Sequence, residues 1–87
     1  MELNGYKEIG YDKLIELLNT RQKKNATLDS EIAVYLGINS TQTVRNAFNK
    51  KTQKVNDKTL SNIMVFLNVD GFIMWHNGSR KYFINKN

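Results

Sequence analysis

A short apolar stripe that stops at a glycine constrains this chain more than any other feature. The stripe comprises Ile32, Ala33 and Leu36. Its spacing predicts a short helix, because side chains three and four residues apart lie on one helix face. Gly37 follows at once, and glycine readily adopts the left-handed conformation that ends a helix. The sequence therefore predicts a helix over residues 28–36, capped by Thr27 or Asp29, with a tight turn after it.

A second short helix is predicted directly after this turn. Ser40 is a favoured residue at a helix start. Val44, Ala47 and Phe48 then follow at the spacing of a buried helix face. The pattern predicts a helix over residues 40–50, packed closely against the first one because Ala33 is small.

Two more amphipathic helices are predicted, over residues 11–24 and 56–69. Asn56 is the expected N-cap of the second of these helices. Residues 1–10 contain two glycines and are expected to form an irregular lead-in.

The C-terminal segment has a different pattern, which predicts a β-hairpin over residues 71–85. Asn77-Gly78 supplies the two residues with positive φ that a type I′ turn requires. A two-residue loop fixes the register, with Trp75 opposite Arg80. One hairpin face then carries Ile73, Trp75, Tyr82 and Ile84. The opposite face carries Phe72, Met74 and Phe83.

The composition is that of one small globular domain covering residues 1–87. The chain has 87 residues, 40% of them hydrophobic, and contains neither cysteine nor proline. It carries a net charge of +5, and residues 32–56 contain no acidic residue. The basic residues of that segment are Arg45, Lys50, Lys51 and Lys54. Such a block is typical of a surface that faces a polyanion, although a solvated lysine-rich surface has the same composition.

The sequence also resembles a known family over about residues 11–69. The similarity is carried by Asp-Ser-Glu-Ile-Ala-Val-Tyr-Leu-Gly-Ile at 29–38, Thr-Val-Arg-Asn-Ala-Phe at 43–48, and the stretch starting at Lys58. These segments resemble the lambda-repressor/Cro-like (XRE-type) helix-turn-helix proteins. The resemblance implies a mainly α fold, a four- to five-helix bundle here extended by a two-stranded antiparallel β-hairpin. It departs from the family in one spacing, since Val44 lies seven residues after Gly37 where six are usual.

The helix over 40–50 would present a polar outer face to double-stranded DNA. Arginine can bind guanine bidentately, while glutamine and asparagine can bridge adenine edges. The expected base-reading residues are Gln42, Arg45, Asn46 and Asn49. The expected phosphate contacts are Ser40, Thr41, Thr43, Lys50, Lys51 and Lys54. We therefore expect a small bacterial or phage transcriptional regulator that reads the major groove with this helix.

The hairpin is the expected contact for a partner. An isolated hairpin is marginal in water, so one face must pack on the helices and the other is free to bind. The residues Ile73, Trp75, Tyr82 and Ile84 are the expected face for a homodimer or for another protein, as in an antitoxin-like interaction module. Two alternatives remain open: residues 1–10 cover the hairpin within one monomer, or its aromatic residues stack RNA bases.

Other classes of protein are not indicated. The sequence contains no nucleophile motif and no glycine-rich phosphate loop, so an enzyme is not expected. His76 is the only histidine, and without cysteine no metal site or other cofactor is expected. No membrane span or signal peptide is visible, so a cytoplasmic location is expected.

Overall fold

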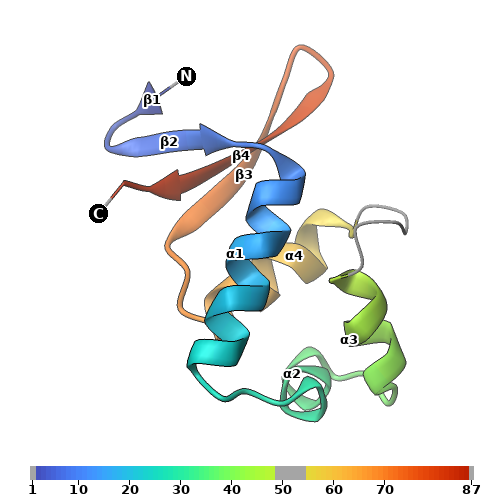
Figure 1. Ribbon diagram of the computed structural model, residues 1–87. Coiled ribbons are helices and arrows are strands. Elements are labelled where there is room, and N and C mark those ends of the chain that lie inside the picture. Colours follow the sequence, from blue (N-terminus) through green and yellow to red (C-terminus); the bar gives the residue numbers. More distant parts are fainter. Residues whose placement is uncertain (1, 49–54, 87) are drawn as a thin grey trace.

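The computed structural model describes residues 2–48 and 55–86, which form four helices and four strands (Figure 1). The helices are α1 (Tyr11–Lys24), α2 (Asp29–Leu36), α3 (Thr41–Ala47) and α4 (Asp57–Phe66). The strands are β1 (Glu2–Leu3), β2 (Tyr6–Ile9), β3 (Gly71–His76) and β4 (Ser79–Asn85). All the strands belong to one antiparallel sheet in the order β1-β2-β4-β3.

This sheet makes the fold α+β, so the expected mainly α fold with a two-stranded hairpin is wrong. The difference comes from residues 1–10, which were expected to be an irregular lead-in. Asn4 and Gly5 have φ angles of 50° and 88°, the two positive values of a hairpin turn, and Leu3 pairs with Tyr6 across it. Strand β2 then pairs along β4, with Ile9 opposite Tyr82.

The C-terminal hairpin has the predicted register. Trp75 lies opposite Arg80, and Phe72 lies opposite Phe83. Asn77 and Gly78 form its turn with φ angles of 51° and 77°. The local signal was sufficient here because a two-residue turn fixes the pairing of both strands.

The helix bounds differ from the predicted ones mainly at the ends. Helix α1 covers the predicted range, but α4 ends at Phe66 rather than 69, because Asn68 takes the left-handed conformation (φ 59°). Asn56 caps α4 as expected, and its Oδ1 accepts from the Thr59 N–H at 2.9 Å. Helix α3 is described only as far as Ala47, with Phe48 after it.

The N-terminus of α2 is capped differently from the prediction. Leu28, rather than Thr27 or Asp29, occupies the N-cap position, and its backbone N–H donates to Glu31 Oε1 at 2.8 Å. The Asp29 side chain is therefore available for other contacts.

One core joins the helices to one face of the sheet. Leu14, Ile15 and Leu18 of α1 are buried in it together with Leu60 and Ile63 of α4. The sheet contributes Tyr82 and Ile84, with Ile73 packed against them. Helix α1 also contacts the chain just after the C-terminus of α4. There Arg21 Nη1 donates to the carbonyl oxygens of Leu67 (3.3 Å) and Asn68 (2.9 Å).

The opposite face of the sheet carries a small aromatic cluster. Phe83 is fully buried and stacks on Phe72 with ring centroids 5.0 Å apart. Tyr6 meets Phe72 edge-on at 5.1 Å. The Tyr6 hydroxyl donates to Asp70 Oδ1 at 2.9 Å, and this hydrogen bond raises the pKa of the hydroxyl. Strand β2 therefore completes both faces of the sheet.

Candidate nucleic-acid interface

Helices α2 and α3 are joined by a tight turn at the end of the molecule away from the sheet (Figure 1). Gly37 ends α2 in the left-handed conformation, with φ 73°. The backbone N–H of Ile38 donates to the carbonyl of Ala33 at 3.0 Å. Ser40 is the N-cap residue of α3, although its side chain makes no capping hydrogen bond.

Helix α3 turns one face inward and the other to solvent, as its periodicity predicts. Val44 is fully buried, and Ala47 and Phe48 pack against the core. The exposed residues at and beyond the start of the helix are Ser40, Thr41, Gln42, Thr43, Arg45 and Asn46. Six of the predicted DNA contacts therefore lie on one exposed segment. Asn49, Lys50, Lys51 and Lys54 lie outside the described residues.

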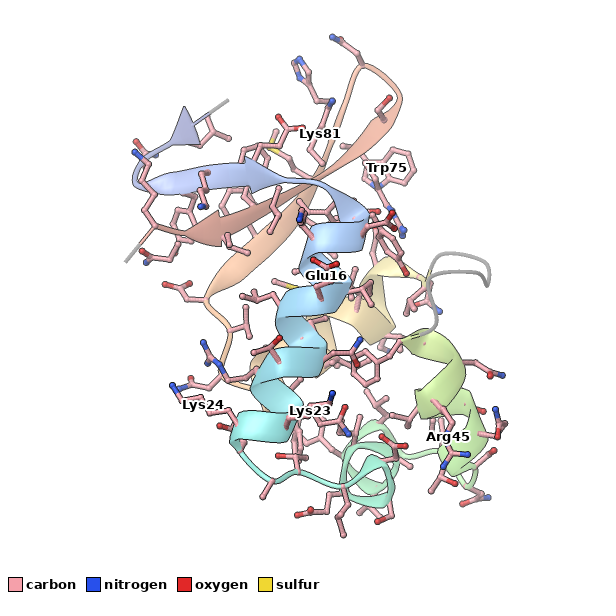
Figure 2. All side chains as sticks on the ribbon, in the orientation of Figure 1. Glu16, Lys23, Lys24, Arg45, Trp75 and Lys81 are labelled. Atoms are coloured by element: carbon pink, nitrogen blue, oxygen red, sulfur yellow. The ribbon has the colours of Figure 1, made fainter. Side chains whose placement is uncertain are left out.

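The three described base-reading candidates are linked to one another. Gln42 Nε2 donates to Asn46 Oδ1 at 2.9 Å, and Arg45 Nη1 lies 3.4 Å from Gln42 Oε1. Together they present amide and guanidinium groups, which are hydrogen-bonding partners suited to base edges. Figure 2 shows Arg45 on α3, at the end of the molecule remote from the sheet.

Comparison with known proteins returns no relative. No family model, no curated protein and no solved structure matches the chain. The candidate site is therefore argued from its own geometry.

Most of the predicted partner face is covered within the protomer. Tyr82 and Ile84 are buried in the core, and Ile73 packs against it. Trp75 remains 63% exposed, and its indole N–H donates to Asp57 Oδ2 at 3.0 Å. These four residues therefore do not form a free apolar surface.

The basic residues of the C-terminal hairpin are engaged in structural contacts. Arg80 binds Asp57 Oδ1 at 2.5 Å and donates to the carbonyl of Val55 at 2.9 Å. Lys81 pairs with Glu8 at 3.6 Å across the sheet. Of the described basic residues, Arg45 is thus the one that belongs to the exposed face of α3.

Two features of this region were not predicted. Asp29, expected only as a possible cap, lies 3.6 Å from Arg45 Nε. Val34 is 78% exposed and lines a shallow hollow with Tyr35 and Phe66, whose rings lie 4.8 Å apart. The sequence carries no local signal for either feature, because its pattern predicts α2 only from the residues that are buried.

The described part of the chain contains neither a cluster of metal-ligating residues nor a helix that could span a membrane. Residues 2–48 and 55–86 contain no cluster of three or more histidine, cysteine or carboxylate side chains that could hold a metal ion. Within the same ranges, none of the helices has the length and apolar character needed to cross a bilayer.

Proposed function

We propose that this protein binds double-stranded DNA in a sequence-specific manner and acts as a small bacterial or phage transcriptional regulator. The observation that carries the proposal is the exposed face of α3, where Gln42, Arg45 and Asn46 form a linked set of hydrogen-bonding side chains. Helix α3 enters the major groove, and α2 crosses the DNA backbone.

Each group on this face has a chemical role in the proposal. Arg45 donates to guanine O6 and N7, while Gln42 and Asn46 bridge adenine edges. The hydroxyls of Ser40, Thr41 and Thr43 bind phosphate oxygens at the start of α3. Asn49 as a base reader and Lys50, Lys51 and Lys54 as phosphate contacts stay predictions from the sequence.

The protein is proposed to act as a homodimer in the cytoplasm. One short reading helix contacts few base pairs, so useful specificity needs two copies on a two-fold site. Strand β3 is an edge of the sheet, and its sequence Gly-Phe-Ile-Met-Trp-His contains no lysine, arginine or carboxylate. Edge strands are commonly protected by such charges, so the β3 edges of two copies are the proposed contact.

Selection from a pool of random DNA duplexes tests this function. The full chain is incubated with the pool at low salt, and the bound duplexes are sequenced after several rounds. We expect enrichment of one site with two-fold symmetry, because the dimer places two α3 helices on successive major grooves. The absence of any complex with duplex DNA would overturn the proposal.

A protein-binding module is the second candidate function. It is favoured by the hollow at Val34, Tyr35 and Phe66, because large apolar side chains grouped on a surface are typical of protein contacts. Purification from the host distinguishes the two functions. Under this candidate, a stoichiometric protein co-purifies with the wild type and is lost from Val34→Glu. Val65→Glu is the control, because Val65 is also an exposed valine but belongs to α4 and does not line the hollow.

A further inference from the structure

Arg45 is not an isolated side chain, because a carboxylate from another helix lies beside it. Its Nε is 3.6 Å from Asp29 Oδ2, at the first residue of α2. The Arg45 side chain is 65% exposed, whereas that of Asp29 is 28% exposed. An exposed ion pair of this kind adds little to folding stability. The ion pair is therefore considered for its effect on how Arg45 binds DNA.

Asp29 is itself fixed by a third helix. Its Oδ1 accepts a hydrogen bond from Gln22 Nε2 of α1 at 2.7 Å. Gln22 Nε2 also lies 3.2 Å from the carbonyl oxygen of Thr27. The position at the N-terminus of α2 further favours a negative charge, because the helix dipole is positive there. The carboxylate is therefore held in place before any ligand binds.

A fixed carboxylate changes which ligand Arg45 can accept. The carboxylate lies 3.6 Å from Nε of the guanidinium, whose Nη1 lies 3.4 Å from Gln42 Oε1. It also repels a DNA phosphate, since two anions cannot share this site without a Coulomb cost. A neutral base edge, such as guanine O6 and N7, meets no such repulsion.

We propose that Asp29 is a specificity-determining positioning residue, which directs Arg45 to a base edge and away from the DNA backbone. This inference rests on the proposed DNA-binding function. It adds a residue that makes no DNA contact of its own and that acts through Arg45.

The test compares Asp29→Asn with Asp12→Asn. Both variants remove one negative charge, but Asp12 lies in the first turn of α1 and has no described contact with Arg45. Binding is measured on the selected duplex, on duplexes with each base pair replaced, and over a range of salt concentrations. Circular dichroism checks that each variant is folded, and Gln22→Met provides a second perturbation that leaves both charges in place.

For Asp29→Asn we expect preference at one base pair to fall by about fivefold or more. The salt dependence should steepen by about 0.9, as Arg45 gains a phosphate contact. Gln22→Met should weaken the same preference to a smaller extent, and Asp12→Asn should leave it unchanged. In an Arg45→Ala background, Asp29→Asn should have no further effect on that preference.

Two results would overturn the inference. One is equal behaviour of Asp29→Asn and Asp12→Asn on a duplex for which the wild type shows a clear preference. The other is a full effect of Asp29→Asn in the Arg45→Ala background, because Asp29 would then act without Arg45. A wild type without any sequence preference contradicts the proposed function instead, so the two failures are distinguishable.

Discussion

Gly71 occupies a position where the fold has no room for a side chain. It stands where the chain enters β3, and a Cβ at this position would overlap the carbonyl oxygen of Phe83 and lie 2.8 Å from Met64 Cε. A backbone carbonyl in a paired strand cannot move aside as the end of a side chain can. The glycine is thus required mainly by the close approach of the β4 backbone, and also by the Met64 side chain of α4.

We predict that Gly71→Ala lowers the free energy of unfolding by about 1–3 kcal/mol, the usual cost of overpacking. Urea denaturation followed by circular dichroism measures the change. Gly10→Ala is the matched control, because a Cβ at Gly10 meets nothing within 4 Å. Equal stability of the two variants would show that the packing at Gly71 is less tight than described.

At the scale of elements, the C-terminal hairpin is attached to the start of α4 through Asp57. Its carboxylate accepts from the Trp75 indole and from Arg80. The Trp75 hydrogen bond lowers the pKa of Asp57 most, and Arg80 lowers it further, while partial desolvation acts in the opposite direction. The ionised form is therefore the one that the fold favours.

This shift predicts a defined pH dependence of stability. Because the pKa of Asp57 is lower in the folded state than its ordinary value of 3.8, the stabilisation is present above that value and is lost as the pH falls through the folded pKa. The stability advantage of the wild type over Asp57→Asn should shrink below about pH 4. Denaturation at a series of pH values measures it, and an advantage that grows with acidity would contradict the assignment.

The N-terminal hairpin shows where prediction of elements from sequence succeeds and fails. The sequence predicts a turn at Asn77-Gly78 because segments long enough for strands, each with several apolar residues, flank it. Asn4-Gly5 is the same dipeptide, but the segments beside it, β1 and β2, are two and four residues long. Most of the pairing of β2 is with β4, at the other end of the chain, so no local pattern reveals it. The helices, whose apolar stripes are local, were predictable.

We predict that Gly5→Ala destabilises the fold by about 1–2 kcal/mol, because alanine is strained at a φ of 88°. Urea denaturation again provides the measurement, with Gly10→Ala as the control. An irregular lead-in would tolerate the substitution, so an unchanged free energy of unfolding would contradict the role of the β1–β2 turn.

At the scale of the whole molecule, the described basic residues lie in different settings. In the hairpin, Arg80 and Lys81 bind Asp57 and Glu8, so these basic groups hold elements together. Arg45 lies at the opposite end, on the exposed face of α3 (Figure 2). A net charge of +5 therefore does not measure the strength of a DNA-binding surface.

The candidate site could be predicted only in part for a similar reason. The exposed face of α3 follows from its periodicity, since Val44 fixes which side is buried. The contacts of Asp29 with Gln22 and with Arg45 join three helices, and no spacing in the sequence predicts them. Contacts of this kind depend on how the helices pack and are visible only in three dimensions.

Base reading by α3 predicts a specific change in the affinity of Arg45→Ala for DNA. Fluorescence anisotropy is measured on the selected duplex and on a scrambled duplex of equal composition, with Lys13→Ala, which also removes one exposed positive charge, as the control. We expect Arg45→Ala to weaken the free energy of binding by about 1–3 kcal/mol for the selected duplex and by much less for the scrambled duplex. Equal losses on both duplexes, or losses matched by Lys13→Ala, would contradict base reading by α3.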